Sequence, residues 1–128
     1  MNNPMHILVV EDTLIAQQVI ARQLMLQGCM VDVASDGAAA IAKAQSAKYD
    51  LILMDIGLGE GPDGFEVTST IKGNCELNKS TVVMAVTAHG DEEYQDKARA
   101  CGMEGYFYKP FTPKDALVVV EYMKNKFK

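Results

Sequence analysis

The sequence predicts an α/β fold, a doubly wound parallel sheet of five strands with helices on both faces, formed by a single domain that spans residues 1–128. Two observations predict it: five short apolar runs recur along the chain, and helical patterns joined by short connections separate them. Four of the runs are nearly continuous in apolar residues, which is typical of parallel strands buried on both faces. A chain of 128 residues can bury such a core without disulfide or metal support.

The expected strands are residues 7–10, 30–34, 51–54, 82–86 and 106–108. The second run alternates polar and apolar residues through Val31, Asp32 and Val33, so we expect it nearer an edge of the sheet.

The first three expected helices follow the first three strands. Residues 14–27 place polar pairs four residues apart among apolar residues, and Gly28 follows as a helix stop. Residues 36–48 are rich in alanine, which allows close packing. A shorter helix over residues 65–72 is expected to end at Gly73 and Asn74.

The last two helices carry start signals. Asp91 is expected to cap a helix that runs to about residue 100, with Gly102 beyond it. Thr112, Pro113 and Asp115 provide an N-cap hydroxyl, a first-turn proline and a third-position acid, and so begin the final helix.

Composition excludes several classes of protein. The formal net charge of −5 disfavours binding to a phosphate backbone, so no nucleic-acid partner is expected. No apolar run is long enough to cross a membrane, and no signal peptide is evident, so we expect a cytoplasmic protein without membrane insertion. Cys29, Cys75 and Cys101 form no C-x-x-C motif and are expected to be reduced and structural.

Polar residues stand where four of the expected strands end: Glu11, Asp12, Asp55, Thr87 and Lys109. Because the carboxyl ends of parallel strands share one edge of the sheet, these side chains should converge there. Each residue alone has an ordinary structural explanation, as a helix-start acid, a turn residue or a solvated lysine. Their joint occurrence at successive strand ends carries the functional hypothesis.

This combination suits magnesium-dependent phosphoryl chemistry. Clustered carboxylates repel one another, and Mg²⁺ binds a few carboxylates together with water and phosphate oxygens. An ionised Asp55 is a competent nucleophile for phosphorus, and Lys109 offers a positive charge to the transferred group. The Thr87 hydroxyl is expected to hydrogen-bond that group after transfer.

Five stretches resemble the response-regulator receiver family: V-V-E-D-T near the start, L-M-D-I-G-L, D-G-F-E, A-V-T-A and Y-F-Y-K-P-F. The resemblance covers nearly the whole chain and implies the flavodoxin-like receiver fold. It identifies Asp55 as the phosphoacceptor. It also implies that Asp12, Asp55 and the Gly57 carbonyl bind Mg²⁺, with Glu11 acting mostly through water.

The resemblance further assigns Thr87 and Tyr106 as a coupled hydroxyl and aromatic switch and Lys109 as the family's lysine. Gly57 and His89 match positions that flank the path of the hydrolytic water, so we expect them to influence the phosphoryl lifetime. The segment between Asp55 and Gly64 departs from the family, because it is about one residue longer, richer in glycine and has its proline displaced.

Two other functions fit the same order of strands and helices. An FMN-binding electron carrier needs a phosphate-binding loop after the first strand, where Glu11 and Asp12 would repel phosphate. A haloacid-dehalogenase-like phosphatase also uses an aspartate nucleophile, but its D-x-D pattern is absent here because Gly57 follows Ile56. Flavin fluorescence and turnover of a generic phosphate ester discriminate these two functions from a signalling phosphoacceptor, which is not a conventional enzyme.

The resemblance is strongest to receivers of hybrid sensor histidine kinases, so the expected partners are a sensor histidine kinase, a histidine phosphotransfer domain or a second receiver. We expect no output domain after Lys128, so the signal is expected to leave through the receiver surface. In the last helix we expect a sheet-facing set: Ala116, Leu117, Val120, Met123 and Phe127. Val118, Val119 and Tyr122 are expected to form a partner surface, although burial of the valines in a rotated helix is an equal alternative.

Overall fold

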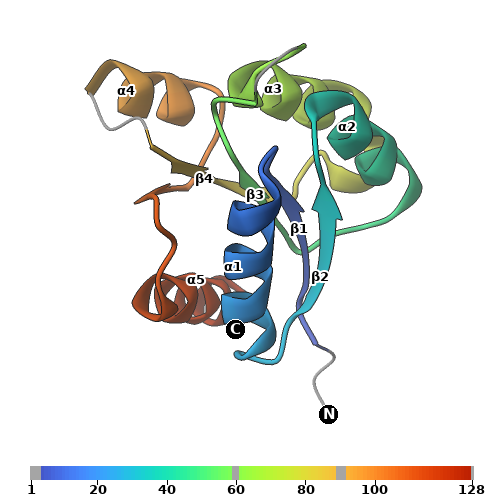
Figure 1. Cartoon of the computed structure of the whole chain (residues 1–128). Coiled ribbons are helices and arrows are strands. Elements are labelled where there is room, and N and C mark those ends of the chain that lie inside the picture. The colour runs from blue at the N-terminus through green and yellow to red at the C-terminus, as the bar shows by residue number, and fades with distance from the viewer. Residues whose placement is uncertain (1–3, 59–60, 89–91, 128) are drawn as a thin grey trace.

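Five parallel strands form one sheet in the order β2-β1-β3-β4-β5. A computed structural model describes residues 4–58, 61–88 and 92–127 (Figure 1). The strands are β1 (His6–Val10), β2 (Met30–Ala34), β3 (Leu51–Met54), β4 (Val82–Thr87) and β5 (Gly105–Tyr108). The predicted fold class is confirmed, and β2 lies at an edge of the sheet as its alternating pattern predicted.

Helices cover both faces of this sheet (Figure 1). They are α1 (Leu14–Met25), α2 (Gly37–Ser46), α3 (Gly64–Asn74), α4 (Glu92–Ala100) and α5 (Pro113–Lys126), with a short 3₁₀ helix η1 (Glu76–Asn78). One core cluster lies between the sheet and α2, α3 and α4 and includes Leu8, Ile52 and Ala98. The other lies between the sheet and α1 and α5 and includes Val9, Leu53 and Val120. Adjacent residues of a strand thus pack into core clusters on opposite faces of the sheet, as expected for a pleated strand.

The helix termini follow the predicted signals. Gly28 has a positive φ of 87° after α1, and Thr112 and Asp115 form a capping box at the start of α5. Asp36 precedes α2 and accepts a hydrogen bond from the Ala39 amide. The predicted cap Asp91 lies outside the described residues.

The predicted orientation of α5 is wrong in part. Val119 is fully buried, whereas Leu117 and Phe127 are exposed. The buried residues Ala116, Val119, Val120 and Met123 recur at intervals of three, one and three. That spacing keeps one stripe toward the core, while Leu117 is displaced by about 100° from Ala116. Val119 therefore belongs to the core, and Val118 and Tyr122 remain on the surface, at 48% and 39% exposure.

All three cysteines are free, and Cys29 and Cys75 are buried, which agrees with the structural role predicted for them. In residues 4–58, 61–88 and 92–127, no helix has the length and apolar character that crossing a lipid bilayer demands.

Candidate functional site

The backbone hydrogen bonding of the sheet continues into the polar residues that follow β1 and β3. The Glu11 amide donates to the Ala34 carbonyl at 3.0 Å, and the Asp55 amide donates to the Val10 carbonyl at 3.0 Å. These bonds extend the ladder by one residue beyond each strand, so the sheet holds the backbone of both acids in place. Glu11 and Asp55 are buried, and Asp12 is exposed at the rim.

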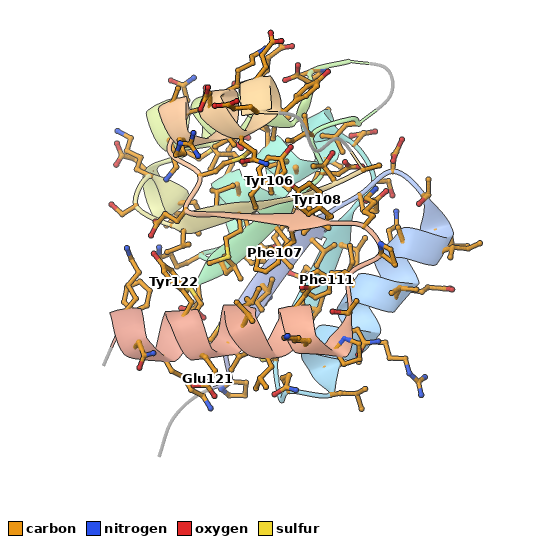
Figure 2. The ribbon with its side chains drawn as sticks, turned by 90° about the vertical axis from the view of Figure 1, so that its left-hand side faces the viewer. Tyr106, Phe107, Tyr108, Phe111, Glu121 and Tyr122 are labelled. Atoms are coloured by element: carbon orange, nitrogen blue, oxygen red, sulfur yellow. The ribbon has the colours of Figure 1, made fainter. Side chains whose placement is uncertain are left out.

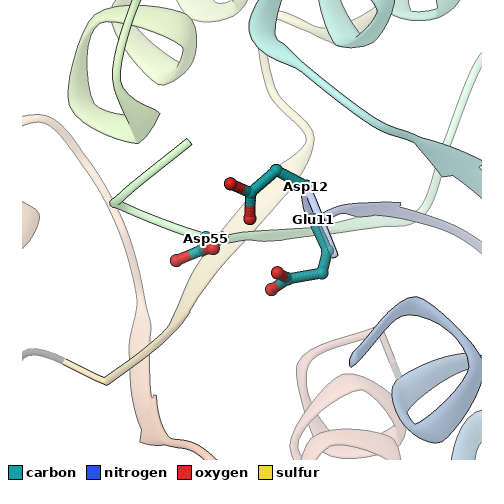
Figure 3. A group of neighbouring side chains, drawn as sticks. All are labelled: Glu11, Asp12 and Asp55. Atoms are coloured by element: carbon teal, nitrogen blue, oxygen red, sulfur yellow. The ribbon is translucent and has the colours of Figure 1, made fainter. Parts of the chain in front are cut away.

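The three acids form one cluster (Figure 3), in which carboxylate oxygens of Glu11, Asp12 and Asp55 lie within 4.8 Å of one another. Partial burial raises the pKa of Asp12 above its ordinary value, and the neighbouring Glu11 raises it further. Asp12 therefore holds a proton more readily than a free aspartate as long as no further cation neutralises the cluster.

Lys109 supplies one positive charge to this cluster. Its ammonium lies 2.6 Å from Glu11 Oε2 and 3.0 Å from Asp55 Oδ2. Desolvation works to lower the pKa of Lys109, but the contacts with the two carboxylates outweigh it and raise the pKa above the ordinary value. Lys109 is therefore fully charged at neutral pH.

The two oxygens of Glu11 differ in their surroundings. Oε1 accepts hydrogen bonds from the Thr13 amide at 3.3 Å and the Thr13 hydroxyl at 3.2 Å. Oε2 is buried and has the Lys109 ammonium close by, but without the alignment of a hydrogen bond. A buried carboxylate oxygen without a hydrogen bond is costly, so Oε2 has capacity for a further donor such as a metal-bound water.

The structure also describes three other predicted site residues. Thr87 is fully buried at the end of β4, and its carbonyl accepts from the Lys109 amide at 3.0 Å. Gly57 is exposed, and its amide donates to Asp55 Oδ1 at 3.2 Å. Tyr106 is half-buried on β5 and packs against the core cluster on the face of the sheet that α2, α3 and α4 cover. His89 lies outside the described residues, so its influence on phosphoryl lifetime stays a prediction, as does that of Gly57.

The glycine-rich segment before α3 is tied back to the site. Gly64 donates to the Ile56 carbonyl at 2.9 Å, and a Cβ at Gly64 would lie 2.4 Å from the Asp55 carbonyl oxygen. Only glycine permits that approach. Gly61 has a φ of 87°, a conformation that glycine adopts without strain, and Asp63 caps α3 through the Glu66 amide. The start of α3 therefore stays packed against Asp55, although the proline of this segment is displaced relative to the family pattern.

An apolar groove beside the acids was not predicted from the sequence. It has a volume of about 360 Å³ and is lined by α1 and by the segment after β5, including Ile15, Val19, Lys109, Pro110 and Phe111. Ile15 is 77% exposed. The exposed apolar residues of α1 were the available signal, but only the folded structure brings them beside Lys109.

Comparison with known proteins agrees with this geometry. The family model of the response regulator receiver domain matches residues 7–121. The transcriptional regulatory protein ResD of Bacillus subtilis is 34% identical over 124 residues, which cover 97% of this chain and 50% of ResD. The sensor protein EvgS of Escherichia coli is 34% identical over 106 residues, which cover 83% of this chain and 8% of EvgS. The chain thus spans half or less of these curated relatives.

Solved structures give the same result. The chemotaxis protein CheY4 of Vibrio cholerae superposes with a TM-score of 0.87 at 28% identity, covering 94% of this chain and 99% of CheY4. The family match, the relatives and the structural likeness agree with the carboxyl-edge cluster of acids and lysine. The chain belongs to the response regulator receiver domain family of two-component signalling.

Proposed function

We propose that this receiver takes a phosphoryl group from a phosphohistidine donor onto Asp55, in a reaction that requires Mg²⁺ and that the chain's own residues catalyse. One observation carries the proposal: the buried Asp55 carboxylate belongs to a cluster of three acids and lies 3.0 Å from the Lys109 ammonium. Asp55 is thus close both to acids that can bind a cation and to a permanent positive charge. The chain acts as a phosphoacceptor rather than as an enzyme with a separate substrate.

The residues fit a divalent cation. Three carboxylates face one ammonium, so two negative charges remain, and the buried Glu11 Oε2 lacks a hydrogen bond. Oxygen ligands of this kind suit Mg²⁺, which retains several waters. Asp12 and Asp55 would hold the ion directly with the Gly57 carbonyl, and Glu11 would hold one of its waters. When bound, the ion neutralises charge on the phosphoryl oxygens.

Transfer follows from the positions of the chain's own groups. An Asp55 carboxylate oxygen attacks phosphorus, and an O–P bond forms while the P–N bond to the donor imidazole breaks. The bonding electron pair leaves with that nitrogen, and Asp55 becomes an acyl phosphate. Lys109 offsets charge on the transferring group, and the Thr87 hydroxyl hydrogen-bonds it afterwards.

Small-molecule phosphorylation tests this function. Acetyl phosphate with Mg²⁺ should add one phosphoryl group per chain, which intact-mass spectrometry measures, and excess EDTA should prevent it. A metal-independent addition, or no addition to folded protein, would contradict the proposal. Turnover of a generic phosphate ester would instead favour a phosphatase.

Asp12→Asn should raise the stability of the metal-free protein and weaken Mg²⁺ binding by at least about tenfold, an estimate for the loss of one charged ligand. The folded state raises the pKa of Asp12, so it binds a proton more tightly than the unfolded chain. Metal-free stability therefore increases as pH falls through that pKa, and asparagine imitates the protonated form. Thermal melts with and without Mg²⁺ measure both effects. Equal responses of the variant and the parent protein to Mg²⁺ would contradict the assignment of Asp12.

The groove between α1 and Pro110 supports a docking role for the donor protein. Its lining includes Ile15 and Lys109, so a helix seated there would stand directly beside Asp55. Helix α1 has one arginine and no acidic residue, although the chain has a net charge of −5. Such a face avoids repulsion of an acidic donor and buries apolar surface on contact.

Ile15→Asp should slow phosphorylation by a phosphohistidine donor protein by about tenfold or more, because a buried contact is lost and a charge is introduced. Phosphorylation by acetyl phosphate should change less than about twofold, since Ile15 touches none of the reacting groups. Gln23→Asp, also on α1 but away from the groove, serves as the matched control. Equal slowing with both donors would point to damage of the site rather than to docking.

The exposed part of the predicted α5 surface supports an output role. Tyr122 donates a hydrogen bond to Glu104, just before β5, and Tyr106 and Tyr108 lie on the side of β5 away from α5 (Figure 2). The rings of Tyr106 and Tyr108 are 5.6 Å apart.

Helix α4 buries only Ala98 among its described residues, and the side-chain amide of Gln95 on α4 donates a hydrogen bond to the Tyr108 hydroxyl. The small buried surface of α4 favours movement of α4 together with β5 when Thr87 turns toward the phosphoryl group.

Beryllofluoride, which imitates the phosphoryl group, should therefore shift the NMR signals of the Tyr106 ring in the parent protein but not in Thr87→Val. Coupling of this kind is typically about 1–3 kcal/mol. Unchanged Tyr106 signals with beryllofluoride demonstrably bound would contradict the switch.

Tyr122→Glu and Val118→Glu should keep the fold and weaken partner binding or self-association. Val119→Glu should instead unfold the domain, because Val119 is buried.

A further inference from the structure

Thr13 occupies the N-cap position of α1 but does not cap the helix. At the other α-helices whose N-cap residue is described, Asp36, Asp63 and Thr112 each accept a hydrogen bond from an amide of the first turn. Thr13 and Thr112 are the same residue type with similar extended backbones, with φ of −102° in both. The different partner of Thr13 therefore comes from its surroundings.

The hydroxyl of Thr13 is directed back toward the acid cluster. It donates to Glu11 Oε1 at 3.2 Å, and the Thr13 amide donates to the same oxygen at 3.3 Å. Two donors on one oxygen fix the rotation of the Glu11 carboxylate and leave Oε2 beside Lys109. The Glu11 backbone is held separately, because its carbonyl accepts from the Gln17 amide group at 2.7 Å and its amide donates to Ala34.

We propose that Thr13 is a positioning residue for the metal-binding step: its hydroxyl orients Glu11 so that Oε2 faces the water of an incoming Mg²⁺. This inference rests on the proposed function. A free carboxylate beside Lys109 would gain by turning both oxygens toward the ammonium, which would withdraw Glu11 from the metal. Thr13 opposes that rotation by holding Oε1. Thr13 makes no capping hydrogen bond, because the side-chain position from which its hydroxyl donates to Glu11 does not bring that oxygen to the amides of the first turn.

The two threonines provide a matched pair for the test. Thr13→Val removes the hydroxyl with little change in shape, and Thr13→Ser retains it. Thr13→Val should weaken Mg²⁺ binding by about tenfold, the low end for residues that orient metal-binding groups. Its melting temperature without metal should change little, because no cap is lost. Thr112→Val should lower the melting temperature by about 3–5 °C and leave Mg²⁺ affinity unchanged.

A second readout needs no metal. In metal-free protein at neutral pH, the ¹³C shift of the Glu11 carboxylate should move in Thr13→Val and stay near the parent value in Thr13→Ser. The inference is overturned if Thr13→Val binds Mg²⁺ like the parent protein, or if it unfolds or melts like Thr112→Val. If the parent protein itself does not bind Mg²⁺, the proposed function fails rather than the role of Thr13 alone.

Discussion

Replacing Asp55 with asparagine should abolish covalent phosphorylation while leaving the fold intact. Asparagine keeps the size of the side chain but lacks an anionic oxygen, so it cannot form an acyl phosphate. The fold should persist because Lys109 still pairs with Glu11 at 2.6 Å and the Asp55 backbone bond to Val10 remains. Intact-mass spectrometry after incubation with acetyl phosphate and Mg²⁺ measures the loss, and circular dichroism checks the fold.

Asp36→Asn is the matched control for this experiment. Asp36 caps α2 away from the acid cluster, and asparagine is an equally good N-cap residue, so both labelling and stability should be retained. Labelled peptides from the parent protein should contain Asp55 and lose the phosphoryl group on treatment with hydroxylamine, which cleaves acyl phosphates. Equal labelling of Asp55→Asn and the parent protein would place the phosphoryl group elsewhere.

The convergence of residues at the strand ends was predictable, because the carboxyl ends of parallel strands lie at one edge of the sheet regardless of how the helices pack. Glu11, Asp55 and Lys109 therefore meet as their order along the chain predicted. The direction of an exposed helix face was harder to predict. Val118 and Val119 are chemically equal, and only the packing of α5 against the sheet decides that Val119 is buried.

Two other features of the site were not predictable from the sequence. Thr13 is an ideal N-cap residue by type, and a sequence gives no reason for its hydroxyl to choose Glu11 over the first turn of α1. The groove beside Lys109 likewise needs α1 and Pro110 to lie together. The groove depends on the distance between elements that are remote in sequence, whereas Thr13 and Glu11 are only two residues apart and their contact depends on the orientation of the two side chains.

Removing the charge of Lys109 should have the largest effect on stability. Lys109→Met leaves Glu11 and Asp55, both buried, without their cation. Breaking a buried ion pair in this way costs about 3 kcal/mol of unfolding free energy, which for a domain of this size lowers the melting temperature by roughly 10 °C. Phosphorylation by acetyl phosphate should slow by about 100-fold, because one charge that stabilises the transferring group is lost.

Mg²⁺ should restore much of the lost stability, since it supplies positive charge to the same carboxylates. Glu11→Gln in the Lys109→Met background should also restore it, because the double variant buries one negative charge fewer. The raised pKa of Lys109 gives the direction of the pH dependence in the parent protein. Its contribution is fully present below the ordinary lysine pKa and is lost as pH rises through the higher folded value.

Urea unfolding of the parent protein, Lys109→Met, Lys109→Arg and the double variant measures these differences with and without Mg²⁺. Lys109→Arg retains the charge and should lose much less stability than Lys109→Met, although its planar group fits the site differently. A stability of Lys109→Met equal to that of the parent in metal-free buffer would mean that water already screens the carboxylates. In that case Lys109 would act on the phosphoryl group alone, and the slower phosphorylation of Lys109→Met would be the remaining effect of the substitution.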